Sequence, residues 1–333
     1  MKIAKQILKI VLPLVLGGAI LYWMYRDFDF QQVRHVLLHE MQWSWMLLSL
    51  PFGVLAQVLR GWRWCQTLEP LGERPRSSVA VYAVFLSYAA SLVIPRIGEF
   101  TRCGVLRRWD GVSFPKALGT VVTERAIDTF IVMIITGLTL LLGMNTFNTF
   151  FHQTGTNVGS IVSGFSWTGW AVTALCIGAA SALIYFLARH LSIYNKVKTT
   201  LRGLWEGVVS LRHVRRHWLF VFFTLGIWVS YFLHFYLTFF SFEFTSHLGI
   251  VCAQVCFVVG SIAVIVPTPN GAGPWHFAVK TMLILYGVQD QQALFFVLIV
   301  HTTQTMLVIL LGVWAWTQLS LSAAALREKK HSA

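Results

Sequence analysis

The chain alternates between long apolar runs and short polar connections over almost its whole length. Nine runs are apolar enough to be membrane-embedded: 7–25, 45–59, 79–95, 118–142, 170–188, 218–241, 249–266, 269–288 and 293–316. Runs of about 20 apolar residues can cross a hydrocarbon core roughly 30 Å thick. The pattern therefore predicts an all-α polytopic membrane protein.

The first run, 7–25, has two interpretations. Lys2, Lys5 and Lys9 precede it, as basic residues precede the apolar part of a signal peptide. The run is too long for that part, however, and it continues into YRDFDF without a small-residue cleavage site. We therefore interpret it as the first transmembrane helix.

The basic residues of the connections predict the orientation. Lys and Arg number three in the N-terminal tail, four in 60–78, five in 96–116, seven in 189–217 and three in the C-terminal tail, whereas 143–169 and 242–248 contain none. The positive-inside rule places the basic connections and both termini in the cytoplasm. Because 60–78 and 96–116 would lie on the same side, the segment 79–95 is expected to be a re-entrant hairpin that bends near 91–98. About eight crossings then remain.

The expected bend carries charges. The stretch SLVIPRIGEFTRCGVLRR (91–108) presents Arg96, Glu99 and Arg102 directly after Pro95. Non-helical backbone at membrane depth is tolerated where protein buries it or where it lines a water-filled cavity. The bend is therefore expected to line a cavity.

A second break, VIVPTPNGAGPWH (264–276), has the same form as the first. Pro95 and Pro267 are 172 residues apart, about half the chain. Paired Gly/Pro interruptions in two halves are a pointer to the substrate site of a transporter. We therefore expect a single domain, 1–333, with an internal inverted repeat whose halves are 1–166 and 167–333, and with the segment 269–288 either crossing or re-entrant.

The helix that follows the first break carries three charges, Glu124, Arg125 and Asp128, in TVVTERAIDTF (120–130). The two carboxylates are four residues apart and share a helix face, so they need a cation between them. A helix that starts near Lys116 would place Glu124 about 12 Å and Asp128 about 18 Å inside it. A start at Ala126 would leave Glu124 and Arg125 at the headgroup level. Ionisable residues within a membrane are candidates for function.

Other polar features have simpler interpretations. Arg60 and Arg63 lie among tryptophans in LRGWRWC and are interpreted as anchors at the membrane interface. His276 is either a proton relay or a packed, hydrogen-bonded histidine. The basic run RHVRRHW (212–218) fits an orientation signal that contacts anionic lipid. The five cysteines are not clustered as ligands, and we interpret them as small buried apolar residues.

Composition supports the membrane assignment and narrows the chemistry. Hydrophobic residues make up 56% of the chain and charged residues 12%, which excludes a water-soluble domain. Nucleic acid explains the net charge of +13 poorly, because the basic residues border apolar segments and no binding module accompanies them. No metal-ligand cluster, nucleophile motif or nucleotide loop occurs, so we expect a protein that is not an enzyme, with no metal and no cofactor.

Taken together, these motifs resemble a known family. The stretch LVIPRIGEFTRCGVLRRWDGVSFPKALGTVVTERAIDTF, followed by VPTPNGAGPWHF, is similar to the lysylphosphatidylglycerol synthase transmembrane-region family of flippase-like membrane proteins. The motifs match in order and spacing, and the resemblance covers nearly the whole chain. Ser91 and Asn270 stand where relatives often carry Asn and Gly. Both departures are mild, because Ser keeps a hydroxyl group and Asn tolerates a positive φ.

The resemblance implies a lipid translocation module in a bacterial inner membrane. Some relatives are fused to a cytosolic aminoacyl transferase; this sequence ends at Ala333 without one, so transferase activity is not expected. We expect translocation of an anionic phospholipid or a polyprenyl-phosphate-type lipid, whose phosphate Arg96 and Arg102 would receive in a cavity between the two breaks. Glu99, Glu124 and Asp128 would hold these arginines in the empty site and could carry protons. A scaffold for envelope lipid or glycan synthesis and a membrane-embedded lipid-modifying enzyme stay open as alternatives, as do the lipid, the direction and the oligomeric state, a dimer included.

The predicted substrate-binding residues come from the two breaks and from the charged helix. They are Ser91, Arg96, Glu99, Arg102, Glu124, Arg125, Asp128, Asn270, Gly271, Gly273 and His276. The predicted structural breaks are at Pro95, Gly98, Pro267 and Pro269.

Overall fold

The structure, a computed structural model, describes residues 15, 17–26, 35–142, 214, 216–266 and 268–331. Side chains are described as far as residue 322, apart from that of Leu142. The predicted segment 170–188, the connection 143–169 and Pro267 lie outside the described residues.

The described residues are helical and contain no strand. Residues 17–25 form an N-terminal helical segment. The α-helices that follow are α3 (Trp43–Leu68), α4 (Ser77–Val93), α5 (Gly98–Asp110), α6 (Phe114–Leu142), α11 (His217–Tyr236), α12 (Glu243–Ser246), α13 (Gly249–Ala263), α14 (Pro274–Leu285) and α15 (Asp290–His331). Short helical turns lie at η1 (Val36–Glu40), η2 (Glu69–Leu71), η4 (Leu237–Ser241) and η5 (Pro269–Gly271).

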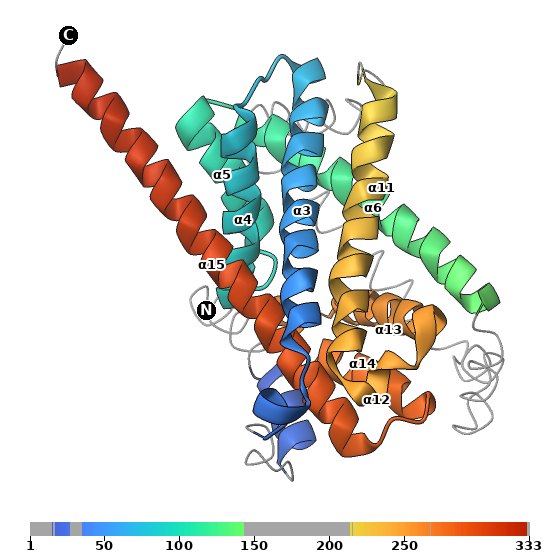
Figure 1. The fold of residues 1–333 in the computed structure, drawn as a ribbon. Helices are drawn as coiled ribbons and strands as arrows, with labels where there is room; N and C mark the ends of the chain where they lie inside the picture. Colours follow the sequence, from blue (N-terminus) through green and yellow to red (C-terminus); the bar gives the residue numbers. More distant parts are fainter. Residues whose placement is uncertain are drawn as a thin grey trace, which may run out of the picture.

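The longer helices follow the same order twice. In each set a long helix, two short helices and another long helix succeed one another: α3, α4, α5 and α6, then α11, α13, α14 and α15 (Figure 1). At 1.5 Å per residue, α4 and α5 are about 25 and 20 Å long, and α13 and α14 about 22 and 18 Å, each shorter than the hydrocarbon core of a bilayer. This shared order agrees with an internal repeat, which stays a prediction.

The helices α4 and α5 form a hairpin whose open ends are fastened together. Arg76, directly before α4, donates from its backbone N–H and from Nε to the carboxylate of Asp110, the last residue of α5, over 2.8 and 2.7 Å. The chain turns at residues 94–97, where Arg96 has a positive φ of 63°. The predicted bend near 91–98 is thus confirmed as a backbone feature.

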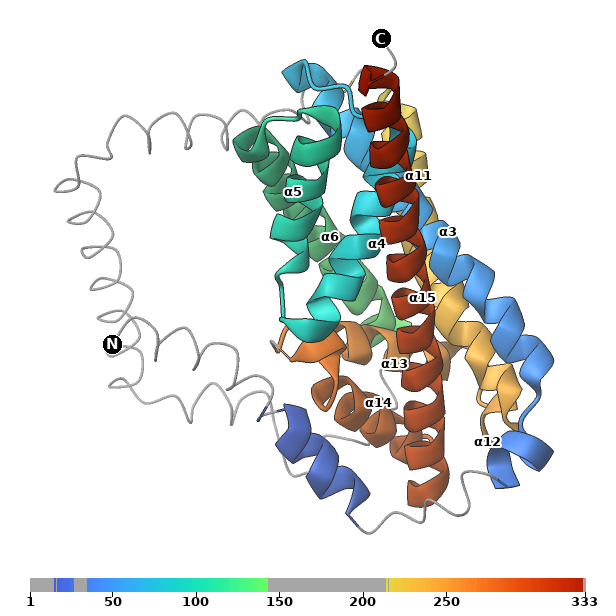
Figure 2. The same cartoon turned by 90° about the vertical axis from the view of Figure 1, so that its left-hand side faces the viewer.

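The helices α13 and α14 form a second hairpin, and the tips of the two hairpins meet. Its turn also contains a non-glycine residue with positive φ, Asn270 at 51°. From the other tip, Arg96 Nη2 donates a hydrogen bond of 2.8 Å to the backbone oxygen of Ile265. Figure 2 shows α4 and α5 above and α13 and α14 below this junction. Pro95 and Pro269 each precede the residue with positive φ, so the two breaks correspond in backbone form.

The two helix sets are joined most closely where α3 packs against α11 (Figure 1). A Cβ atom at Gly53 would lie 2.8 Å from the His234 ring, and one at Gly226 would lie 2.9 Å from Leu59. His234 Nδ1 also makes a hydrogen bond of 2.8 Å with the backbone oxygen of Ser49. Glycine thus permits the close approach of these two helices from both sides.

Two described helical stretches are long and apolar enough to cross a membrane. They are His217–Ser241 and Asp290–Ser322. The helices Ser77–Val93 and Gly249–Ala263 are apolar but shorter. The predicted number of about eight crossings therefore stays a prediction.

Two glycines of α5 test the packing of the first hairpin. A Cβ atom on Gly98 would collide with Ser87 O and approach Ser91 Oγ, whereas one on Gly104 would meet nothing within 4 Å. We expect Gly98→Ala to destabilise the fold by about 1–3 kcal/mol, because α5 must move away from α4. Gly104→Ala is expected to be neutral or to stabilise by about 0.5–1 kcal/mol. Thermal unfolding of the purified variants in detergent measures both; equal melting temperatures would contradict the tight contact at Gly98.

The hairpin also predicts which residues share one side of the membrane. In a variant without the five native cysteines, single cysteines at Arg74 and Arg107 are expected to react with an impermeant thiol reagent from the same side, because the two open ends of the hairpin are joined. Labelling from opposite sides would show that α4 and α5 do not return to the side they enter from.

Candidate functional site

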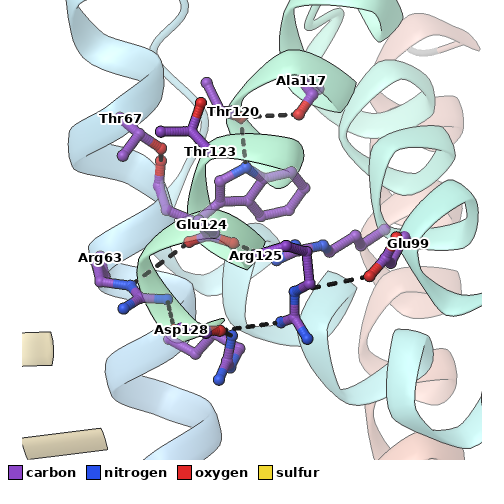
Figure 3. A network of polar contacts seen from close by, with 12 residues as sticks. Arg63, Thr67, Glu99, Ala117, Thr120, Thr123, Glu124, Arg125 and Asp128 are labelled. Atoms are coloured by element: carbon purple, nitrogen blue, oxygen red, sulfur yellow. Dashed lines mark hydrogen bonds and ion pairs between the residues drawn. The ribbon is translucent and has the colours of Figure 1, made fainter. Parts of the chain in front are cut away.

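Five buried charged residues meet between α3, α5 and α6. They are Arg60 and Arg63 of α3, Arg102 of α5, and Glu124 and Asp128 of α6. Among the described residues, these are the buried residues of the Asp, Glu, Lys and Arg types. We refer to these five, with Glu99 and Arg125 at their edge, as the arginine network (Figure 3).

Asp128 is the shared partner of two α3 arginines. Its Oδ2 lies 2.7 Å from Arg60 Nη1, and its Oδ1 lies 3.0 Å from Arg63 Nη2. Arg125, one turn earlier on α6, reaches the same carboxylate with Nη2 over 3.3 Å. Three guanidinium groups therefore surround one carboxylate, which fixes the rotation of α6 relative to α3.

Glu124 connects α6 to α5. Its Oε2 accepts a hydrogen bond of 2.7 Å from Arg102 Nη1, and its Oε1 lies 3.7 Å from Arg63 Nε. The Arg102 guanidinium lies 4.7 Å from the centre of the Trp64 ring, and Trp64 Nε1 donates to Thr120 Oγ1 over 2.9 Å. Arginine stacks readily on aromatic faces. Arg102 is therefore held by an ion pair and by an aromatic surface that is itself hydrogen-bonded.

The edge of the arginine network is less enclosed. Arg125 Nε lies 3.6 Å from Glu99 Oε1, and these side chains are 45% and 38% exposed. Figure 3 shows Arg125 between Glu99 and Asp128. Arg125 thus links the buried charges to the first turn of α5, where the helix dipole favours an acidic residue.

The buried charges do not balance. Three guanidinium groups face two carboxylates, and the Glu99–Arg125 pair at the edge adds no net charge. The formal excess is one positive charge. Among the described residues, four buried arginine nitrogens of the network, Arg60 Nε, Arg63 Nε, Arg102 Nε and Arg102 Nη2, and one buried acceptor, Glu124 Oε1, have no hydrogen-bond partner. A buried charge and unpaired donors cost free energy, so this arrangement favours an added anion or water.

The structure confirms one expectation about this network and corrects another. Glu124 and Asp128 have the arginine partners that their spacing predicted. The interpretation of Arg60 and Arg63 as interface anchors is wrong, because both are buried and paired with Asp128. Residues three apart share a helix face. That face points inward, while Trp62 on another face is 42% exposed.

Arg96 and Ser91 of the first break have partners outside this network. Arg96 is exposed at the hairpin tip, where it holds Ile265, whereas Arg102 is buried on α5. Ser91 donates from its hydroxyl to Ser87 O over 3.0 Å and lies beside Gly98. The structure therefore does not bring Arg96 and Arg102 together on one ligand site.

The second break has its own polar cluster. Asn270 Nδ2 donates to Thr305 Oγ1 over 2.9 Å, and Asn270 O makes a hydrogen bond of 3.1 Å with His301 Nε2. The rings of His276 and His301 lie 4.4 Å apart. Gly271 and Gly273 have φ values of 73° and 92°, which glycine adopts without strain. The second break is thus hydrogen-bonded to α15 through Asn270, and Arg96 connects it to the first hairpin.

The described residues contain no group of three or more His, Cys, Asp or Glu side chains placed to hold a metal ion. The charged groups of the arginine network are mostly guanidinium groups. Guanidinium groups present paired N–H donors that match a phosphate or a carboxylate.

Comparison with protein families agrees with the ordered motifs. Residues 10–312 match the model described as the lysylphosphatidylglycerol synthase TM region. The chain belongs to this family. Comparisons with curated proteins and with solved structures gave no match. As a member of the lysylphosphatidylglycerol synthase TM-region family, the chain is a membrane protein, and its arginine network lies within the matched region.

The excess charge predicts unequal effects of removing the two partners of one ion pair. Glu124→Gln raises the excess positive charge to two, whereas Arg102→Gln removes it. We therefore expect Glu124→Gln to lower the free energy of unfolding by about 3–5 kcal/mol, and Arg102→Gln to lower it by less. The double variant should be more stable than Glu124→Gln alone. Glu99→Gln, in a half-exposed pair, should cost about 0–1 kcal/mol. Thermal unfolding in detergent gives the ranking; a less stable Arg102→Gln variant would contradict the charge excess.

Proposed function

We propose that this membrane protein translocates a lipid whose headgroup carries a phosphate, such as an anionic phospholipid or a polyprenyl-phosphate-type lipid. The buried excess of positive charge in the arginine network carries this proposal. In this mechanism the phosphate supplies the missing negative charge and accepts hydrogen bonds from the unpaired nitrogens of Arg102 and Arg60. Only the headgroup needs a polar environment, because the acyl chains stay in the bilayer.

Arg102 is the residue best prepared for this role. Nη1 is engaged by Glu124, while Nε and Nη2 are unpaired, so one edge of the guanidinium is held and the other is free. Trp64 supports the flat face of the group. An arginine that is already oriented loses less conformational entropy when a phosphate binds.

The half-exposed pair of Glu99 and Arg125 lies between the buried charges and the outside of the network. A headgroup that enters here competes with Glu99 for Arg125, and this exchange opens access to Asp128 and Arg102. Surface ion pairs contribute little to stability, so such an exchange costs little. Arg96 then acts at the junction of the hairpins, where its bond to Ile265 O holds the two tips together.

The proposed setting is a bacterial inner membrane with both termini in the cytoplasm. The basic residues at the open ends of the α4–α5 hairpin, Arg74 and Arg76 before α4 and Arg107 and Arg108 at the end of α5, support this orientation. Five charged residues are buried at high cost, and we place translocation before scaffolding or lipid modification because translocation makes use of their excess charge.

Reconstituted vesicles test the proposal. We expect the protein to accelerate the transbilayer movement of fluorescent phosphatidylglycerol, and Arg102→Lys to slow it about tenfold or more. Lysine keeps the charge opposite Glu124, so the fold is retained, but it lacks the planar fork that binds phosphate. The rate of loss of fluorescence on addition of an impermeant quencher measures the movement.

Arg107→Lys is the matched control, because Arg107 is exposed on the same helix; its rate should equal that of the unaltered protein. The rates for fluorescent analogues of phosphatidylglycerol, phosphatidylcholine and polyprenyl phosphate show which class of lipid is moved. The proposal is wrong if the unaltered protein moves none of these lipids, or if Arg102→Lys moves them at the normal rate.

A further inference from the structure

Two tyrosines from different helix sets share a hydrogen bond beside the arginine network. Tyr88 of α4 and Tyr231 of α11 bring their hydroxyl oxygens to 2.6 Å from each other. In Figure 1 these two helices flank α3, and both pack against it. The two side chains therefore bridge α4 and α11 and connect the first helix set to the second. We refer to Tyr88 and Tyr231 as the tyrosine pair.

The tyrosine pair lies next to Arg60, a member of the arginine network. The guanidinium carbon of Arg60 lies 5.9 Å from the centre of the Tyr231 ring, and the charge of Arg60 acts on the hydroxyl groups of both tyrosines. Arg60 Nη1 donates to Asp128 over 2.7 Å, whereas Arg60 Nε is buried and has no hydrogen-bond partner. Arg60 therefore keeps a donor for an anion, and the tyrosine pair lies beside it.

The tyrosine pair can make more hydrogen bonds than the one its members share. Each phenolic hydroxyl can donate one hydrogen bond and can also accept. Whichever hydroxyl donates within the pair, the other keeps its own hydrogen, and neither hydroxyl donates to a further acceptor among the described residues. A half-buried O–H donor beside a guanidinium group with an unpaired N–H is suited to bind a phosphate oxygen, which accepts from both kinds of donor.

Along the first hairpin, the tyrosine pair lies between Arg102 and the turn. The backbone oxygen of Ser87, the neighbour of Tyr88 in the chain, faces Gly98, the first residue of α5. Arg102 lies one turn beyond Gly98, toward the open end of the hairpin, whereas Arg96 precedes Gly98 at the tip. Under the proposed function, a headgroup that moves from Arg102 toward the junction at Arg96 therefore passes the tyrosine pair.

We propose that Tyr88 and Tyr231 position the phosphate of the lipid beside Arg60. In the empty site their mutual hydrogen bond connects α4 to α11. When a headgroup reaches Arg60, a phosphate oxygen accepts from the two hydroxyls in place of this bond, so that a contact between the helix sets is exchanged for a contact with the ligand. The inference rests on the proposed function, because it assigns two further residues to the same headgroup path.

The double variant Tyr88→Phe/Tyr231→Phe of the full-length chain tests this role. It keeps both rings and removes both hydroxyls together, so neither is left without its partner, and we expect the melting temperature in detergent to be unchanged. Native mass spectrometry measures the affinity for phosphatidylglycerol and for diacylglycerol, which lacks the phosphate. Binding of phosphatidylglycerol should weaken about tenfold, the equivalent of one hydrogen bond to a charged group, while binding of diacylglycerol stays the same.

Tyr82→Phe is the matched control with unchanged affinity, because the Tyr82 ring packs edge-on to Trp314 on the same helix as Tyr88 and its hydroxyl makes no hydrogen bond among the described residues. Should the double variant not fold, Tyr231→Phe takes its place. Unchanged binding of phosphatidylglycerol, or equal weakening for both lipids, overturns the inference and leaves translocation standing. If the unaltered protein moves no lipid while its binding of phosphatidylglycerol depends on the two hydroxyls, the proposed function is wrong and the tyrosine pair stands as a phosphate contact.

Discussion

The cost of burying charge in an apolar protein is the constraint around which this fold is arranged. Arg60, Arg63 and Arg102 can lie inside the helix bundle because Glu124 and Asp128 reach all three of them. Removing one partner from such a cluster leaves a charge with neither water nor a counter-ion. The relative rotation of α3, α5 and α6 is therefore set by ion pairs. The short distance between α3 and α11 is set by packing at Gly53 and Gly226.

The turns of the two hairpins meet inside the bundle, where the regular hydrogen bonding of the helices is interrupted. Each tip contains a non-glycine residue with positive φ, and one bond from Arg96 to Ile265 O connects them. Residues in that region of backbone space are strained by about 1–3 kcal/mol and persist only when their surroundings hold them. Under the proposed translocation, a junction of strained residues held by this hydrogen bond is the place where the two hairpins would separate.

The sequence predicted most of the elements but placed some functional side chains wrongly. The apolar runs predicted the helices. Two basic segments, which the positive-inside rule places on the same side of the membrane, predicted the α4–α5 hairpin. Both features depend on local composition. The pairing of Glu124 and Asp128 followed from their four-residue spacing. The role of Arg60 and Arg63 did not follow, because tryptophan neighbours are equally typical of an interface. Their three-residue spacing, matched to the two carboxylates of α6, was the available signal. The proximity of His276 and His301, whose rings lie 4.4 Å apart, depends on the packing of α14 against α15 and left no local pattern.

The arginine network has a consequence for how the protein is made. All its charged members come from residues 60–128, so the carboxylates that neutralise the first arginines follow them within one stretch of nascent chain. Contacts with the later half involve neutral groups: Arg63 Nη1 donates to Thr224 Oγ1 over 3.4 Å, and the guanidinium groups of Arg60 and Arg63 each lie 5.9 Å from a ring centre, that of Tyr231 and that of Phe220. Each arginine of the network can therefore meet a carboxylate within the first set of helices, before α11 leaves the ribosome. During membrane insertion, no arginine of the network then depends on a carboxylate of the second half for its ion pair.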